Sequence, residues 1–160
     1  MVAVLLVMGR DPICPCGIVR VWQSGLDPAE NSQQFADAYS LLHIVFGMGL
    51  AAFVSWMRPR WSTGALLLSV LFGHSLWEIA ENTPLIIGLF SGGANAPHYE
   101  GDSILNSLGD TVFALAGALF ARRMPWWANA AMVIGVEIAV TLAIDDGFVI
   151  GTLRLLGVDI

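Results

Sequence analysis

Four apolar stretches constrain the fold of this chain more than any other feature of its sequence. They cover residues 38–57, 64–82, 103–121 and 126–144. A bilayer core about 30 Å thick is crossed by about 20 apolar helical residues, so each stretch has the length of a transmembrane helix. The sequence therefore predicts an all-α membrane protein in which a bundle of four transmembrane helices forms a single domain, residues 1–160.

Charged residues are too scarce for a soluble domain. They make up 12% of the chain, against about 25% in soluble proteins, and 56% of the residues are hydrophobic. This composition excludes a disordered chain, and two cysteines are too few for a disulfide-rich secreted fold. The net charge is −6, so a nucleic-acid partner, which requires a basic surface, is excluded as well. The implied partner is membrane lipid.

Arginines at the ends of the stretches indicate the orientation in the membrane. Arg58 and Arg60 follow the first stretch, and Arg122 and Arg123 close the third, whereas the loop 83–102 has no basic residue. Short loops rich in arginine remain on the cytoplasmic side. The sequence thus predicts a bacterial inner-membrane protein whose segment 9–37 and loop 83–102 face the periplasm. Arg10 and Arg20, in segment 9–37, are exceptions to this rule. The apolar run 2–8 is interpreted as a partial N-terminal anchor helix or an interfacial segment.

Polar residues gather at one end of three of the stretches. In the first and third they come early, and in the second, which runs the opposite way, they come late, so all would lie in the outer half of the bundle. The polar residues concerned are Asp37, Ser40, His43, His74, Glu78, Glu81, Asn82, Asp102, Ser103, Asn106, Ser107 and Asp110. Because ionisable groups inside a membrane are costly, they mark functional sites or interior networks.

The spacing of these residues places them on helix faces that can meet. His74 and Glu78 are four residues apart, and Glu81 follows three residues later. Asp102 and Asp110 are separated by whole helical turns, so they also share one face. Residues three, four and seven positions apart share a face, so the sequence predicts an outward-facing polar pocket between the helices.

Three chemistries fit such a pocket. Histidine and carboxylate ligands suit a divalent metal ion such as zinc, iron or manganese, for which the candidates are His43, His74 and Glu78. Clustered carboxylates can also act as general acid and base, and here the candidates are Glu78, Glu81, Asp102 and Asp110, supported by Asn82, Ser103 and Asn106. The alternatives are a hydrogen-bonded network that only joins helices, and a pathway for protons or ions.

The fourth stretch has two distinct faces. Gly135 and Ala139 belong to a stripe of small residues, which permits close helix contact, and Glu137 lies roughly opposite that stripe. If the stripe packs inside the bundle, Glu137 faces outward. If Glu137 faces inward, the stripe is left to contact a neighbour. Both arrangements favour an interface with other subunits of a membrane complex, and the alternative is that the small residues simply face lipid.

Cys14 and Cys16 lie in the predicted periplasmic segment, where thiols tend to oxidise. They are separated by a single residue, and the sequence offers no second cysteine pair of the kind that zinc ribbons use. A disulfide, half of a metal site, or two free thiols in a turn all agree with this pattern.

Several motifs resemble an uncharacterised family of small integral inner-membrane proteins of proteobacteria. They extend over most of the chain: Cys14-x-Cys16-Gly17, Glu30-Asn31-Ser32-Gln33, His43-Ile44-x-x-Gly47, Trp77-Glu78-x-x-Glu81-Asn82 and Gly101-Asp102-Ser103. The resemblance implies a membrane protein in which the polar blocks matter, and it implies no particular activity.

Two positions depart from the family's pattern. Phe46 stands where members usually carry a second histidine, and Asp145-Asp146-Gly147 replaces an Arg-Asp-Asn-like block. The first departure removes a candidate metal ligand. More distantly, the acidic residue and histidine that enter the first stretch are similar to those of VanZ-like teicoplanin-resistance proteins.

The sequence therefore favours a small membrane protein with an outward-facing carboxylate and histidine site that binds or processes a cell-envelope or lipid-linked substrate. The alternative is an accessory subunit, without enzymatic activity, of a larger respiratory or photosynthetic membrane complex. It is favoured by the small size of the chain and by the two-faced fourth stretch.

Overall fold

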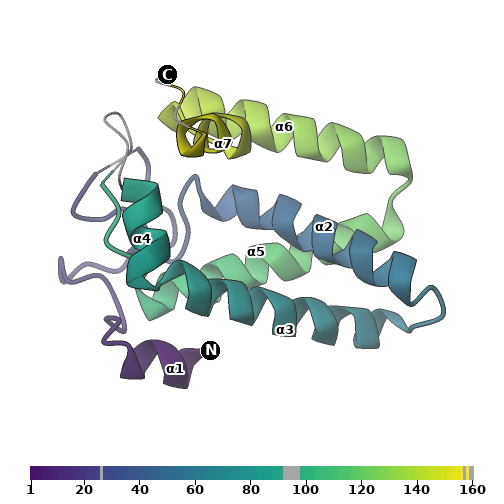
Figure 1. Ribbon diagram of the computed structural model, residues 1–160, viewed down its shortest axis with the longest axis horizontal. Helices are drawn as coiled ribbons and strands as arrows, with labels where there is room; N and C mark the ends of the chain where they lie inside the picture. Colours follow the sequence, from purple (N-terminus) through teal and green to yellow (C-terminus); the bar gives the residue numbers. More distant parts are fainter. Residues whose placement is uncertain (26, 92–97, 157, 159–160) are drawn as a thin grey trace.

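The computed structural model describes residues 1–25, 27–91, 98–156 and 158, and all regular structure in these residues is helical (Figure 1). The helices are α1 (Val2–Val7), α2 (Ser40–Met57), α3 (Thr63–Glu81), α4 (Pro84–Ser91), α5 (Ile104–Arg123), α6 (Trp126–Ile144) and α7 (Phe148–Leu155). The predicted all-α architecture is confirmed.

Helices α2, α3, α5 and α6 are long and apolar enough to cross a membrane, which is the architecture of a multi-pass membrane protein. They coincide with the four predicted stretches to within two residues at each end. Two starts are fixed by capping serines, because Ser62 accepts a hydrogen bond from the backbone of Ala65, and Ser103 accepts one from Asn106. Arg122 and Arg123 belong to the last turn of α5 rather than following it.

The prediction that residues 83–102 form a loop is wrong for the first part of that range. Helix α4 occupies Pro84–Ser91, and residues 92–97 lie outside the described part of the chain. Proline is well suited to the first turn of a helix, while it disfavours helical geometry in the residue before it. The apolar run after Glu81 therefore starts a new helix instead of extending α3.

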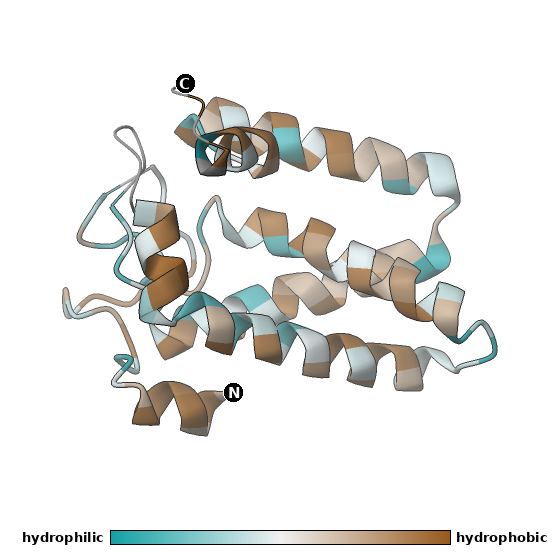
Figure 2. Cartoon of the chain, viewed as in Figure 1, coloured by the Kyte–Doolittle hydropathy of each residue, from teal (hydrophilic) through white to brown (hydrophobic). Residues whose placement is uncertain are grey.

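The two ends of the bundle differ in composition. Figure 1 shows that α2 and α5 begin at the end where α3 and α6 finish, and that α4 and α7 lie at this same end. Figure 2 shows hydrophilic loop residues gathered there, whereas α1 is hydrophobic throughout. We call this the polar end of the bundle.

Helices α2 and α5 pack most closely, through glycines. A Cβ atom on Gly47 would collide with the backbone of Ala114, and one on Gly117 would collide with the backbone of Ile44. Small residues allow this close approach between membrane helices. Toward the other end of the bundle, an apolar cluster of Ala51, Leu66, Val70 and Ala118 joins α2, α3 and α5.

The segment 9–37 covers the start of α5. The first N–H groups of a helix have no partner within it, and here the backbone N–H of Ile104 donates to the carbonyl of Asp11 at 2.8 Å, and that of Leu105 donates to Pro12 at 3.1 Å. The side-chain amide of Asn106 donates to the carbonyl of Gln34 at 2.9 Å. These bonds hold the segment against the polar end.

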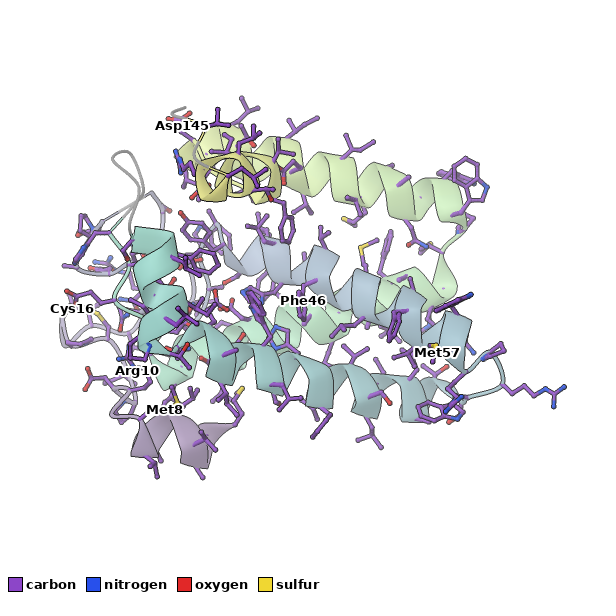
Figure 3. All side chains as sticks on the ribbon, viewed as in Figure 1. Met8, Arg10, Cys16, Phe46, Met57 and Asp145 are labelled. Atoms are coloured by element: carbon purple, nitrogen blue, oxygen red, sulfur yellow. A yellow bond between two sulfur atoms is a disulfide. The ribbon has the colours of Figure 1, made fainter. Side chains whose placement is uncertain are left out.

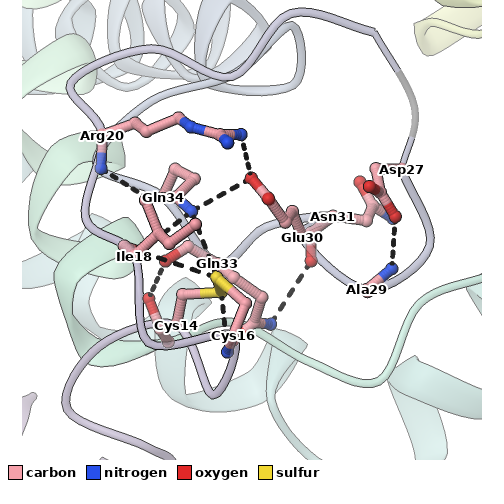
Figure 4. The surroundings of a disulfide bond; sticks show 11 residues. Cys14, Cys16, Ile18, Arg20, Asp27, Ala29, Glu30, Asn31, Gln33 and Gln34 are labelled. Carbon is pink, nitrogen blue, oxygen red and sulfur yellow. Dashed lines mark hydrogen bonds and ion pairs between the residues drawn. A yellow bond between two sulfur atoms is a disulfide. The ribbon is translucent and has the colours of Figure 1, made fainter.

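A disulfide and an ion pair order the same segment (Figure 4). Cys14 and Cys16 are joined by a disulfide. The fully buried amide of Gln34 donates to Glu30 at 3.1 Å, and Glu30 in turn pairs with the guanidinium of Arg20 at 2.6 Å. The described residues of this segment thus form an ordered cover rather than a loose linker.

The close α2–α5 contact yields a test. We expect Gly47→Ala to lower the free energy of unfolding by about 1–3 kcal/mol, because the added methyl group overpacks the contact with Ala114. Gly49→Ala is the matched control on the same helix, since nothing lies within 4 Å of a Cβ there. Thermal unfolding of the purified chain in detergent measures both. Equal melting temperatures for the two variants would contradict this packing.

Candidate functional site

A group of buried polar side chains lies between α2, α3 and α5 at the polar end. His43 comes from α2, His74 and Glu78 from α3, and Asp110 and Thr111 from α5. The side chains of His74 and Glu78 are completely buried, and His43 and Asp110 are almost so. Each of these helices carries its polar residues at the end that meets the others, so the three faces converge.

Two imidazoles and one carboxylate point toward a common centre. His43 Nδ1 lies 2.8 Å from His74 Nε2. Glu78 Oε1 lies 3.4 Å from the same nitrogen of His74 and 3.7 Å from that of His43. We call these three residues the His–Glu group.

The outer nitrogens of the two rings face other partners. The hydroxyl of Thr111 lies 2.8 Å from the carbonyl of Ser107 and 3.3 Å from His74 Nδ1. When this hydroxyl donates to Ser107, it accepts from His74 Nδ1, and His74 Nε2 then presents a lone pair to the centre. The outer nitrogen of His43, Nε2, lies 3.7 Å from the carboxylate of Asp110.

This arrangement fits a metal ion. A tetrahedral zinc site with bonds of about 2.0–2.1 Å separates its donor atoms by about 3.3–3.4 Å, and the three distances of 2.8, 3.4 and 3.7 Å lie on both sides of that value. Metal-bound histidines hold their other nitrogen against a hydrogen-bond partner. Thr111 has this position beside His74, and the carboxylate of Asp110 lies 3.7 Å from the outer nitrogen of His43. The donors of the His–Glu group can hold a divalent cation.

A second group of acidic side chains adjoins the first and shares one member with it. Glu78, Glu81 and Asp102 each place an oxygen within 4.8 Å of the others. Asp102 is held firmly, because it accepts hydrogen bonds from Asn82 at 2.7 Å and from Tyr99 at 3.0 Å. We call Glu78, Glu81 and Asp102 the carboxylate group.

Burial changes the acidity of Asp102. It raises the pKa of this carboxyl to about 6, while the hydrogen bonds from Asn82 and Tyr99 act in the opposite direction. Asp102 lies just before α5, outside the four long helices. Near neutral pH it is therefore an anion, held in place by two donors.

The structure gives the predicted supporting residues different positions. Asn82 bonds to Asp102 and so lies within the site. Asn106 and Ser103 instead bind the backbone of the cover segment, through the carbonyls of Gln34 and Gln33. They position the start of α5, and neither makes a described hydrogen bond to the carboxylates.

Residues of the fourth span lie away from this site. Glu137 accepts hydrogen bonds from the backbone of Phe148 at 3.1 Å and of Val149 at 2.8 Å, and so caps the start of α7. Gly135 and Ala139 are exposed on the surface of α6. The small residues therefore remain uncovered within the described chain, and Glu137 contacts α7, which neither of the two predicted arrangements included.

Sequence reasoning missed two residues that contact the site. Thr111 orients His74, and its signal is the hydroxyl repeat Ser103, Ser107, Thr111 at every fourth position, which marks one helix face. Tyr99 donates to Asp102 from a connection without periodicity, so no spacing predicts it.

Phe46 occupies the position at which the chain departs from the resembling family. Its ring packs edge-on against His74, with ring centroids 5.6 Å apart, and also contacts Trp77. Figure 3 shows it between α2 and α3. An apolar ring thus covers one side of the His–Glu group.

A pocket of about 300 Å³ opens beside both groups. Its polar lining includes His43, Glu81, Asp102 and Asp110. Its apolar lining comes from α2, α3, α4 and α7, and consists of Leu42, Phe46, Trp77, Leu89, Phe90 and Phe148. The pocket therefore combines an acidic floor with apolar walls.

Comparison with known proteins places these features in a family. Three bacterial relatives, each described as a UPF0314 protein, are 40% identical over 153 residues (Sphingopyxis alaskensis), 44% over 163 residues (Novosphingobium aromaticivorans) and 39% over 152 residues (Paracoccus denitrificans). These alignments cover 96%, 96% and 95% of this chain and 81%, 80% and 79% of the relatives. No solved structure matches the chain. The model of the family "Protein of unknown function (DUF2585)" matches residues 5–158, and the chain belongs to this family, as its resemblance to uncharacterised proteobacterial membrane proteins predicted.

Proposed function

We propose that this protein binds a divalent metal ion at the His–Glu group and uses the site to bind or process a lipid-linked substrate of the cell envelope. The observation that carries the proposal is the convergence of His43 Nδ1, His74 Nε2 and Glu78 Oε1. These three atoms lie close enough together to bind one cation, which would replace the proton between the two imidazole rings. A divalent ion serves all three at once.

The shape of the pocket supports an amphipathic substrate. A polar head would meet the floor formed by His43, Glu81 and Asp102, where a metal ion supplies positive charge. An apolar chain would lie along aromatic walls that include Phe46 and Trp77. Ligand pockets commonly pair apolar walls with a few convergent polar groups.

The distribution of arginines supports placing this site at the periplasmic face of a bacterial inner membrane. Arg58, Arg60, Arg122 and Arg123 lie at the end of the bundle opposite the polar end. Clusters of arginine next to membrane spans stay in the cytoplasm. The polar end would then face the periplasm, where lipid-linked precursors of the envelope are exposed.

Removal of two ligands tests metal binding. We expect the purified full-length chain to carry stoichiometric zinc, iron or manganese, and the double variant His74→Ala, Glu78→Ala to lose it, because only one donor of the group remains. Mass spectrometry of the metal content measures both.

The control uses an equivalent pair on the surface. His98 Nε2 lies 3.0 Å from Glu100 Oε1, and both side chains are exposed, so His98→Ala with Glu100→Ala should keep the metal. If the purified chain carries no metal and rebinds none, and the inner variant only melts at a lower temperature, the group is a structural network.

Cysteine labelling tests the orientation. In a Cys14→Ser, Cys16→Ser background, we expect His98→Cys to react with a membrane-impermeant maleimide added to intact spheroplasts. Pro59→Cys, in the α2–α3 connection, should react only after the membrane is permeabilised. Labelling in the reverse order would place the polar end in the cytoplasm and exclude a periplasmic substrate.

A second candidate function rests on the surface of α6. Because Glu137 is used within the chain, the small residues Gly135 and Ala139 lie bare on the outer face of this helix. Small residues on membrane helices permit close contact with another helix. We also infer from this face a role as an accessory subunit of a larger membrane complex.

Cross-linking distinguishes this role from an enzyme that works alone. In the same cysteine-free background, Gly135→Cys should cross-link to a different protein in native membranes, and mild-detergent extracts should migrate well above the monomer in a native gel. Leu108→Cys, exposed on α5, is the control. Monomeric migration without cross-links would exclude the subunit role.

A further inference from the structure

The carboxylate group lies beside the His–Glu group and offers a second set of oxygen atoms that can bind a metal ion. Glu81 follows Glu78 by three residues on α3, so both carboxylates project from one face of the helix. Asp102 approaches them from the segment before α5. Glu78 has two oxygens, and it belongs to both groups.

The burial of Glu78 is the independent observation that points to a second ligand. Its side chain has no exposed surface, and neither of its oxygens has a hydrogen bond of normal geometry among the described residues. The hydroxyl of Ser107, which also lacks such a bond, is the neighbouring donor. One buried oxygen of Glu81, Oε2, also lacks a described partner. A buried, charged carboxylate is normally paired with a hydrogen-bond donor, a positive group or a metal ion.

Few positive groups are described beside these carboxylates. The described ion pairs of Glu78 are those with the imidazoles of His43 and His74. No ion pair with an arginine is described for Glu78, Glu81 or Asp102, and the nearest influence of this kind is that of Arg10, which lowers the pKa of Asp102. A cation bound in the His–Glu group would contact Oε1 of Glu78. The second oxygen of Glu78 and the carboxylate of Glu81 would then be free to bind a second cation.

Asp102 has the surroundings of a metal ligand. Asn82 and Tyr99 each donate to a different oxygen of its carboxylate, at 2.7 and 3.0 Å, and each oxygen keeps a further lone pair. Hydrogen bonds of this kind orient metal-binding carboxylates. Asp102 is therefore fixed in place while it remains able to bind a cation.

We propose that Glu78 bridges two divalent cations, one held by His43 and His74 and the other by Glu81 and Asp102. The inference rests on the metal site proposed above and extends it to a dinuclear centre. Two-metal sites with ions about 3.5–4 Å apart use this kind of shared ligand. The second position offers only oxygen donors, which suit Mn²⁺ or Mg²⁺. Glu81 and Asp102 line the pocket, so the second ion would face the substrate.

Metal counting tests the dinuclear centre. The purified chain in detergent is stripped with a chelator, reloaded with Mn²⁺ and separated from free ion. We expect two bound ions per chain and an electron paramagnetic resonance spectrum of two coupled Mn²⁺ ions. Glu81→Gln should leave one ion and abolish the coupling, whereas Glu100→Gln, an exposed carboxylate two residues from Asp102, should change neither.

The outcomes separate this inference from the function on which it rests. One ion per chain, uncoupled and unchanged by Glu81→Gln, would overturn the second position and leave the His–Glu site standing. Absence of bound metal would overturn both. If Glu81→Gln fails to fold, the count and the spectrum of the unaltered chain still decide the question.

Discussion

The close contact of α2 with α5 is the interaction on which the site depends. Gly47 and Gly117 let the two backbones meet without intervening side chains. His43 lies one turn before Gly47, and Asp110 lies one turn before Ala114, against which Gly47 packs. The contact therefore fixes how far the imidazole on one helix lies from the carboxylate on the other. A wider separation of α2 and α5 would leave room for water and would move the imidazole and carboxylate groups apart.

Burial of acidic groups explains why a small chain devotes so much structure to one end. A charge in an apolar environment is costly unless it is paired. The segment 9–37 binds the start of α5 through backbone carbonyls, and α4 and α7 contribute to the pocket walls. These elements shield the carboxylates from bulk water, yet they leave a pocket of about 300 Å³ open beside them.

The long helices and the convergence of polar faces could be predicted from the sequence because both follow from simple periodicity. Length and hydropathy define a span, and residues four apart, such as His74 and Glu78, must share a face. Arginine placement adds the direction of each helix. Together these rules were sufficient to place the same polar residues at one end of the bundle.

The remaining features depend on contacts that periodicity does not encode. Helices α4 and α7 have eight residues each, which is too short for a clear pattern, and α7 is capped by Glu137 from another helix. The cover segment, residues 9–37, is organised by Gln34, whose side-chain amide bonds to the backbone of Arg20, 14 residues earlier, and to the side chain of Glu30. Thr111 matters only because His74 lies opposite it on a neighbouring helix.

The balance of donors and acceptors separates a metal site from a network that only joins helices. In a hydrogen-bonded network that stabilises the fold without a metal ion, each buried acceptor is paired with a hydrogen-bond donor. Here the two inner nitrogens lie 2.8 Å apart and share a single proton, and the carboxylate of Glu78 faces both without a described hydrogen bond. The metal ion proposed above would serve all three atoms at once.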